Sequence, residues 1–136
     1  MNEKFDNVKL SIITVNLNNK NGLELTLKSV KTLFSYVNYH CEHIIIDGVS
    51  TDGSVEIARD YSNTFKQVKF VSELDRGIYD GMNKGLRIAS GEWIYFLNSG
   101  DCIVNASEWV SLFDGIYPNM HLISFQSYQC LSLIHI

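Results

Sequence analysis

The chain has 136 residues, 46% of them hydrophobic, which fits one domain with a buried core. Eleven basic residues against fifteen acidic ones give a formal net charge of −4, without the basic stripe that nucleic-acid binders carry. No apolar run reaches the length of a membrane span, and residues 1–9 lack the basic-then-apolar order of a signal peptide. The three cysteines, Cys41, Cys102 and Cys130, lie far apart and are expected to be free thiols of a cytoplasmic protein.

Short apolar runs alternate along the chain with segments of helical periodicity. The runs predict strands at 10–15, 43–47, 68–72 and 93–97, and the start of a fifth strand at 122–125. Apolar stripes predict helices over 23–37, from Asp52 as N-cap to about Tyr61, over 78–90 with Gly91 as its C′ residue, and over 109–116 after Asn105 as N-cap. This alternation predicts an α/β fold, with an open, mainly parallel sheet covered by helices on both faces.

Polar residues follow every predicted strand. Asn16 follows the first, Asp47 ends the second, Asp75 and Arg76 follow the third, and the sequence NSGD at 98–101 follows the fourth. One such residue alone is more simply a turn or a helix cap, but the carboxyl ends of parallel strands meet at the edge where α/β proteins bind ligands. Four together predict a binding rim.

The loop after the first strand, NLNNKNG at 16–22, is neither a G-x-G-x-x-G fingerprint nor a Walker A loop. This argues against a nicotinamide-dependent enzyme and against a P-loop ATPase. Without a glycine-rich cradle, a bound diphosphate needs another source of positive charge. The prediction is a divalent cation, Mg²⁺ or Mn²⁺, held by carboxylate oxygen.

Four segments carry a family resemblance: SIITVNLNN at 11–19, IIIDGVSTDGS at 44–54, SELDRGIYDGMNKG at 72–85 and GEWIYFLNSGD at 91–101. In order and spacing they resemble the family 2 glycosyltransferases, above all the bacterial enzymes of exopolysaccharide, capsule and O-antigen assembly. The resemblance implies a Rossmann-like GT-A fold and inverting transfer of a sugar from a UDP- or GDP-sugar to a hydroxyl of a glycan or lipid-linked acceptor. It also implies a cytoplasmic enzyme that, at full length, associates peripherally with the membrane.

The resemblance assigns roles position by position. The backbone of Thr14, Val15 and Asn16 would lie along the nucleoside, and Asp47 would accept hydrogen bonds from the base, although it could equally be a turn acid satisfied by backbone N–H groups. The residues expected along the base, diphosphate and donor sugar are Asp75, Arg76, Asp80, Asn83, Lys84, Asn98 and Ser99. The simpler alternative for Arg76 and Lys84 is a solvated helix face. Ile78 and Met82 are expected in the core, and Asp52 is expected to be structural.

The metal signature of the family, Asp-x-Asp-Asp or Asp-x-Asp, is reduced here to Asn98, Ser99, Gly100 and Asp101. Asp101 keeps the carboxylate at the position that contacts the metal, and Asn98 can offer a neutral carbonyl oxygen. Such a site predicts that metal and nucleotide bind together.

The family's catalytic base, an Asp or Glu well beyond the metal motif, has no candidate here. Only Asp114 follows Asp101, and it lies in a predicted helix as a solvated side chain. The last six residues, 131–136 (LSLIHI), match the translation of the transposon end that is used to build sequencing libraries. We therefore expect a donor-binding half at 1–130, truncated after about its fifth strand, and a non-native tail at 131–136.

Three other functions fit parts of the pattern. A sugar-nucleotide pyrophosphorylase needs a glycine-rich, arginine-containing loop after the first strand, and a receiver-like module needs paired acids there. Residues 16–22 supply neither. The third alternative is that these 136 residues bind a nucleotide and catalyse nothing.

Overall fold

The computed structural model describes residues 8–37, 41–107, 122–125 and 131–135. Its strands are β1 (Leu10–Asn16), β2 (Cys41–Asp47), β3 (Val68–Ser72), β4 (Trp93–Phe96), β5 (Leu122–Phe125) and β6 (Leu131–His135). Its helices are α2 (Lys20–Val37), α3 (Ser54–Thr64) and α4 (Ile78–Ile88). All five predicted strands are present, and the helix predicted over 109–116 lies outside the described residues.

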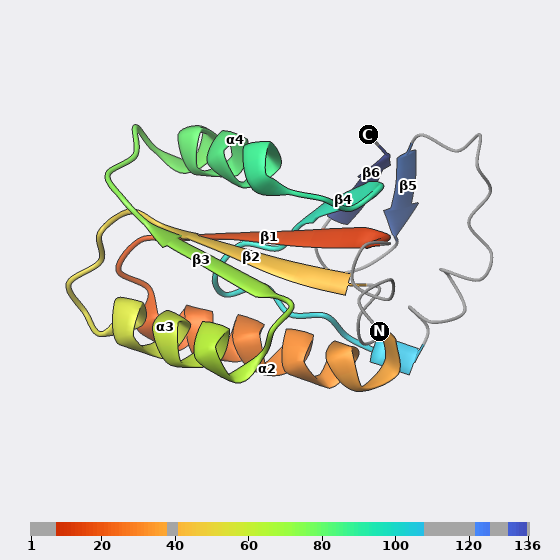
Figure 1. The fold of residues 1–136 in the computed structure, drawn as a ribbon, viewed down its shortest axis with the longest axis horizontal. Helices are drawn as coiled ribbons and strands as arrows, with labels where there is room; N and C mark the ends of the chain where they lie inside the picture. The colour runs from red at the N-terminus through yellow and green to blue at the C-terminus, as the bar shows by residue number, and fades with distance from the viewer. Residues whose placement is uncertain (1–7, 38–40, 108–121, 126–130, 136) are drawn as a thin grey trace.

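The six strands form one sheet in the order β3-β2-β1-β4-β6-β5. The first four of these are parallel to one another, whereas β6 pairs antiparallel with both β4 and β5. Helix α4 covers one face of the sheet, and α2 and α3 cover the other (Figure 1). The predicted α/β fold, mainly parallel with helices on both faces, is confirmed.

Strand β6 comprises most of the segment that we expected to be a non-native tail. Trp93 of β4 pairs with His135, and Leu122 of β5 pairs with Ile134. Antiparallel pairing needs only a strand-forming segment beside an open sheet edge, so it is compatible with either origin of 131–136. The origin of these residues stays a prediction.

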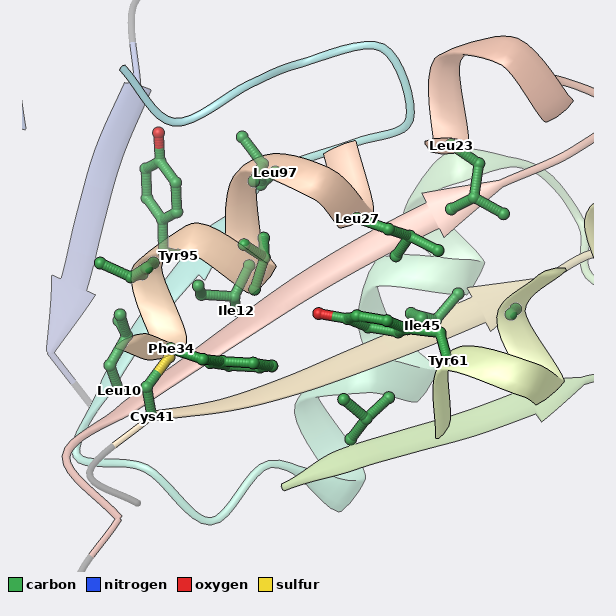
Figure 2. Close-up of a cluster of buried hydrophobic side chains, with 14 of the residues drawn as sticks. Leu10, Ile12, Leu23, Leu27, Phe34, Cys41, Ile45, Tyr61, Tyr95 and Leu97 are labelled. Carbon is green, nitrogen blue, oxygen red and sulfur yellow. The ribbon is translucent and has the colours of Figure 1, made fainter. Parts of the chain in front are cut away.

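The core lies on both faces of β1 and β2, the two middle strands of the parallel part of the sheet. Every residue of β1 and of β2 is buried, as expected for parallel strands with helices on both sides. The larger cluster fills the space between the sheet and helices α2 and α3, where Ile12 and Ile45 meet Leu27, Phe34 and Tyr61 (Figure 2). The smaller cluster, around Ile13, Ile44, Ile46 and Ile94, lies on the face that α4 covers.

Helix α4 approaches the sheet through two glycines, and of the predicted apolar stripe Leu86 and Ala89 pack against the smaller cluster. Gly81 and Gly85 are its buried residues. A Cβ atom at Gly85 would lie 2.5 Å from Cγ2 of Ile13, and one at Gly81 would lie 2.8 Å from Cγ1 of Val15. Ile78 is 46% exposed, so its predicted core position is wrong, and Met82 is half-buried. The backbone of α4 therefore contacts β1 closely, which leaves Ile78 at the outer edge of the contact.

Two predicted helix caps are also wrong. Helix α3 begins after Gly53, which has φ 100° and forms no side-chain cap, while Asp52 accepts hydrogen bonds from Ser54 N–H (3.0 Å) and Lys20 N–H (2.8 Å). The Asp52 carboxylate thus joins the first turns of α3 and α2. Helix α4 ends at Ile88 with Ala89 as its C-cap, and Gly91 instead lies against β1, where a Cβ atom would come within 2.6 Å of Ser11 Oγ.

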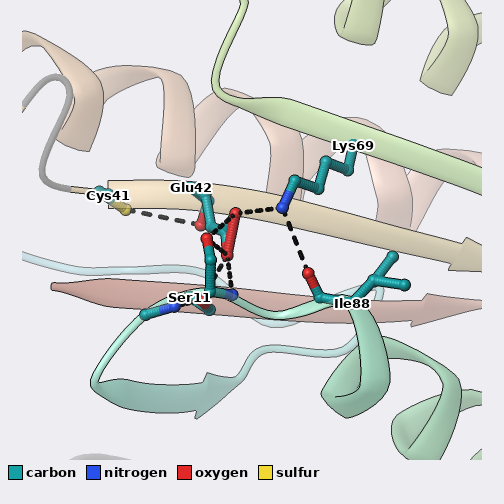
Figure 3. Close-up of polar contacts among 7 residues, drawn as sticks. Ser11, Cys41, Glu42, Lys69 and Ile88 are labelled. Carbon is teal, nitrogen blue, oxygen red and sulfur yellow. Dashed lines mark hydrogen bonds and ion pairs between the residues drawn. The ribbon is translucent and has the colours of Figure 1, made fainter. Parts of the chain in front are cut away.

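A buried carboxylate joins the strands at their amino ends (Figure 3). Glu42 is 3% exposed and accepts hydrogen bonds from Ser11 Oγ (2.6 Å) and Ser90 N–H (2.7 Å). Lys69 forms an ion pair with it at 2.8 Å and also donates to the carbonyl of Ile88 at the end of α4 (3.2 Å). Burial alone raises the pKa of Glu42, but the hydrogen bonds from Lys69, Ser11 and Ser90 outweigh it and lower the pKa.

Cys41 and Cys102 are free thiols, as predicted, and Cys130 lies outside the described residues. Across the described part of the chain, no helix combines the length and apolarity that crossing a membrane requires.

Candidate ligand site at the carboxyl ends of the strands

A continuous chain of side-chain hydrogen bonds joins the carboxyl ends of the four parallel strands. Ser99, after β4, donates to Oδ1 of Asn16 at the end of β1 (2.7 Å). Asn16 Nδ2 donates to Asp47 at the end of β2 (2.9 Å), and Ser72 at the end of β3 donates to the same carboxylate (2.9 Å). The chain Ser72–Asp47–Asn16–Ser99 follows the strand order, and the sequence-predicted rim is therefore one connected structure.

Asp47 is the centre of this chain and is saturated with donors. Its Oδ1 accepts from Asn16 Nδ2 and from Ser50 Oγ (2.6 Å), and its Oδ2 accepts from Ser50 N–H (2.8 Å) and from Ser72 Oγ. The residue is 1% exposed. Burial alone raises the pKa of Asp47, but the donors Ser50, Asn16 and Ser72 together lower it. The predicted turn acid is thus present, although side chains supply most of its donors, and base recognition by Asp47 stays a prediction.

The turn after β2 carries backbone strain. Val49 has φ 65°, a left-handed conformation that is unfavourable for a β-branched residue, and its side chain is 45% exposed. The next residue, Ser50, holds the turn: its hydroxyl donates to Asp47 and accepts the N–H of Asn18 (2.8 Å), itself at φ 48°. Strain of this kind costs about 1–3 kcal/mol and concentrates at functional sites.

The loop between β3 and α4 brings a second carboxylate to the rim. Asp75 Oδ1 accepts the N–H of Gly77 (3.1 Å). Asp75 Oδ2 has no hydrogen-bond partner among the described residues, and it lies 3.0 Å from the position of a Cβ atom at Gly48, directly beside Asp47. Asp75 is half-buried. It therefore presents one open acceptor oxygen next to a carboxylate that has none.

The two predicted phosphate-binding cations differ in their surroundings. Arg76 is exposed, and its guanidinium forms no ion pair or hydrogen bond with the described part of the chain. Lys84 has a side chain only 15% exposed, which donates to the carbonyl of Leu74 (2.6 Å) and forms ion pairs with Glu73 (3.3 Å) and Asp80 (3.7 Å). The solvated-face alternative is therefore wrong for Lys84, which stabilises the loop. Contact of Lys84 with a phosphate stays a prediction, because the ammonium group would have to leave these partners to reach it.

The turn after β4 places Asp101 at the rim. Asp101 N–H donates to the carbonyl of Asn98 (2.9 Å), and the hydroxyl of Thr26 in α2 donates to the carbonyl of Asp101 (2.7 Å) while it accepts the N–H of Gly100 (3.0 Å). Asn98 Oδ1 accepts the N–H of Val15 at 3.4 Å. The Asp101 carboxylate is half-buried and has no hydrogen-bond or ion-pair partner within the described ranges.

The remaining predicted residues are placed as follows. Thr14 is fully buried, and its hydroxyl contacts His43 and the carbonyl of Leu97, so the nucleoside contact predicted for its backbone stays a prediction. Val15 is 8% exposed and packs against Gly81. Asp80 accepts the N–H of Arg76 (2.9 Å), and Asn83 is exposed on α4. The described residues contain no group of three or more His, Cys, Asp or Glu that could hold a metal ion by itself.

Sequence reasoning missed three hydroxyl residues that build the site: Ser50, Ser72 and Thr26. A signal existed for Thr26, because it lies on the predicted buried face of its helix between Leu23 and Leu27 and therefore needs a polar partner there. Ser50 and Ser72 gave no comparable signal, since serine is common in turns and at strand ends.

A mainly parallel sheet with helices on both faces, whose parallel strand ends are joined into one polar rim, defines an α/β domain with its candidate ligand site at the carboxyl ends of the strands. The chain belongs to glycosyl transferase family 2, whose family model matches residues 11–128. This membership decides against the pyrophosphorylase and the receiver-like alternatives.

An uncharacterized glycosyltransferase of Mycobacterium tuberculosis is 39% identical over 92 residues, which are 68% of this chain and 34% of that relative. The chain therefore spans about a third or less of the length of the curated relatives it matches. Two solved structures are similar in fold. A mannosyltransferase from Pyrobaculum calidifontis in complex with GDP-Man and Mn²⁺ has a TM-score of 0.73 at 21% identity, with 85% of this chain and 34% of that chain covered. S. aureus TarS in complex with UDP-GlcNAc has a TM-score of 0.69 at 23% identity, with 79% and 32% covered. The fold is GT-A.

Proposed function

We propose that this chain is the donor-binding half of an inverting glycosyltransferase that transfers a sugar from a UDP- or GDP-sugar to an acceptor hydroxyl in cell-surface polysaccharide synthesis. The observation that carries the proposal is the Ser72–Asp47–Asn16–Ser99 chain, which joins all four strand ends at the ligand-binding edge of a family 2 domain. In this proposal the acceptor is a glycan or a lipid-linked sugar, and none of these 136 residues is assigned as the catalytic base.

The nucleoside, in this proposal, lies along the ends of β1 and β2. Asp47 forms the wall behind the base, and Asp75 Oδ2 accepts a base N–H, because it is the open carboxylate oxygen beside Gly48. Arg76 and Asn83, both exposed, contact the phosphates and the donor sugar. Asn98 and Ser99 line the opposite side of the nucleotide, and Ser99 Oγ keeps lone pairs free because its proton is donated to Asn16.

A divalent cation fits the residues at Asp101. The protein offers one carboxylate, without a partner among the residues described, and such hard oxygen ligands suit Mg²⁺ or Mn²⁺. A cation on a single carboxylate must complete its ligand shell from diphosphate oxygens and water, so it should bind together with the nucleotide. When bound, it supplies positive charge beside the departing diphosphate. Tight binding of Mn²⁺ to the protein without nucleotide, measured by calorimetry, would contradict this part of the proposal.

Nucleotide titration by calorimetry tests the function. UDP, GDP and ADP are compared, each with and without Mn²⁺, on the wild type and on Asp75→Asn, Arg76→Gln and Asp101→Asn. We expect saturable binding of UDP or GDP over ADP, weakened on the order of tenfold by each substitution, as for the loss of one charge-assisted hydrogen bond. Equal affinity for all three nucleotides would contradict the proposal.

The matched control is Asp60→Asn. Asp60 is an exposed carboxylate on α3 without a side-chain hydrogen bond in the described structure, so its loss changes the net charge as Asp75→Asn does but touches no site residue. We expect Asp60→Asn to leave the nucleotide affinity unchanged. A loss equal to that of Asp75→Asn would mean that net charge, and not a specific contact, determines binding.

A further inference from the structure

A second chain of polar side chains crosses the sheet beneath the strand ends. Tyr61 of α3 contacts Nδ1 of His43 (3.1 Å), His43 Nε2 contacts the hydroxyl of Thr14 (2.7 Å), and that hydroxyl donates to the carbonyl of Leu97 (2.6 Å). Thr14, His43 and Leu97 are each 0% exposed. The chain thus joins α3, β2, β1 and the residue that follows β4, and its three inner members have no contact with solvent.

The direction of every hydrogen bond in this chain follows from its last member. A carbonyl oxygen only accepts, so the single proton of the Thr14 hydroxyl goes to Leu97. The Thr14 oxygen must then accept from His43 Nε2–H, which leaves Nδ1 of a neutral ring as the acceptor for the Tyr61 hydroxyl. Burial lowers the pKa of His43 to about 3, so the neutral ring that this pattern requires is the stable form. Each donor in the chain has one acceptor.

The chain ends at the carbonyl that directly precedes the Asn98–Asp101 turn. Leu97 N–H pairs with the carbonyl of Ile13 (2.9 Å), and its carbonyl oxygen is held by Thr14. At the other end of the turn, Thr26 holds the carbonyl of Asp101 (2.7 Å). Two threonine hydroxyls, from β1 and from α2, therefore fix the carbonyls of Leu97 and Asp101 on either side of the exposed Gly100, which has φ 102°.

We propose that Thr14, held by His43, is a positioning residue that fixes the turn carrying Asp101 from inside the sheet. Removal of the Thr14 hydroxyl would leave the carbonyl of Leu97 buried and without a hydrogen-bond donor among the described residues, and the turn would have to move to satisfy it. Tyr61 is the distal member, whose loss leaves the Thr14–Leu97 bond in place. The consequence for nucleotide affinity rests on the proposed function, whereas the hydrogen-bond pattern and its effect on the turn do not.

The decisive variants are Thr14→Val, which keeps the shape of the side chain without its hydroxyl, and Thr14→Ser, which restores the hydroxyl. Long-range ¹H–¹⁵N NMR of the wild-type ring should show His43 neutral and protonated at Nε2 throughout pH 5–8. In Thr14→Val we expect altered amide shifts and at least tenfold faster amide exchange at Ser99 and Asp101, and UDP–Mn²⁺ affinity weakened on the order of tenfold. Thr14→Ser should return both to within about twofold of the wild type.

Tyr61→Phe is the matched control. It removes one hydroxyl from the same chain and should lower the melting temperature while amide exchange at Ser99 and Asp101 stays unchanged. An Nδ1-protonated or doubly protonated His43 ring at neutral pH would overturn the proposal, as would a folded Thr14→Val protein with wild-type exchange in the turn.

The test remains decisive if Thr14→Val does not fold. An Nε2-protonated His43 ring together with wild-type exchange in Thr14→Ser then supports the proposal, and a different ring state or altered exchange in Thr14→Ser contradicts it. A wild type that binds no nucleotide refutes the proposed function, whereas the positioning role of Thr14 is still decided by the ring state and the amide exchange.

Discussion

Replacement of Gly85 by alanine tests the close contact between α4 and the central strand. The added Cβ atom would lie 2.5 Å from Cγ2 of Ile13, 3.2 Å from its Cδ1 and 3.3 Å from its Cγ1. Ile13 is 0% exposed, and its Cγ2 is attached directly to the strand residue's Cβ, so it cannot rotate away without a new clash in the core. The helix must therefore move outward, and overpacking of this kind costs about 1–3 kcal/mol of the free energy of unfolding.

The sign of this effect should reverse when Ile13 is truncated. In an Ile13→Ala background all three of the contacting atoms are absent, and Gly85→Ala should then stabilise α4 by about 1 kcal/mol through its higher helix propensity. The double-mutant cycle should thus give a coupling free energy of about 2 kcal/mol or more. Urea denaturation, monitored by circular dichroism, measures the free energy of unfolding of each of the four proteins in the cycle. Gly81→Ala with Val15→Ala repeats the test at the neighbouring contact, where the Cβ–Cγ1 distance is 2.8 Å, in case Ile13→Ala alone abolishes folding.

Asn83→Ala on the exposed face of the same helix is the control, and it should stabilise slightly in every background because it changes helix propensity and no contact. A Gly85→Ala protein more stable than the wild type would refute the reasoning. So would an equal effect of Gly85→Ala in the presence and absence of the Ile13 side chain.

Three further predictions concern strain and charge. Val49→Gly should raise the free energy of unfolding by about 1 kcal/mol in urea, because it relieves a β-branched residue at φ 65° that buries little surface; a destabilised variant would contradict this. Since folding lowers the pKa values of Asp47 and Glu42 from 3.8 and 4.5, their contribution is complete above those values and is lost as pH falls through the lower folded values. Thermal melting from pH 7 to pH 3 should show a falling melting temperature at the acid end, with a shallower fall in Glu42→Gln, and a rise on acidification would be incompatible. Lys69→Met should cost about 1–2 kcal/mol in the same urea assay, less than for a fully buried pair because Lys69 is 46% exposed, and Glu42→Gln in that background should recover part of it.

The strands and the rim could be predicted from the sequence because each depends on the pattern of residues within a short segment of the chain. Runs such as 10–15 and 43–47 are apolar without alternation, which is the pattern of parallel strands buried on both faces. Once the strands are parallel, their carboxyl ends must lie at one edge. Asn16, Asp47 and Ser99 could therefore be placed together, although 83 residues separate the first from the last.

The contacts among the rim residues could not be predicted in the same way. Asp47 meets Ser72 and Asn16 across 25 and 31 residues, and no periodicity relates these positions. The prediction of how α4 packs on the sheet failed for a different reason. Apolar identity placed Ile78 in the core, but the helix uses the absence of side chains at Gly81 and Gly85 to approach the strand, and this clearance has no signature in hydrophobic periodicity. The cap at Asp52 failed because Gly53 takes the N-cap position while Asp52 joins α3 to α2, and the cap at Gly91 failed because this residue packs against β1 instead of its own helix.

The Ser72–Asp47–Asn16–Ser99 chain constrains what a ligand can bring to the rim. Ser72 and Ser99 both donate their only protons inward, to Asp47 and Asn16, so each offers lone pairs outward. Asp75 Oδ2 is a further acceptor, and Asp47 has no capacity left. An anionic group placed directly on Ser72, Ser99 and Asp75 would face acceptor oxygens of these side chains and would be repelled. The proposed nucleotide must therefore place N–H and O–H donors of the base and ribose against this rim, and its diphosphate must lie farther out, where the exposed guanidinium of Arg76 and a cation at Asp101 can balance the charge.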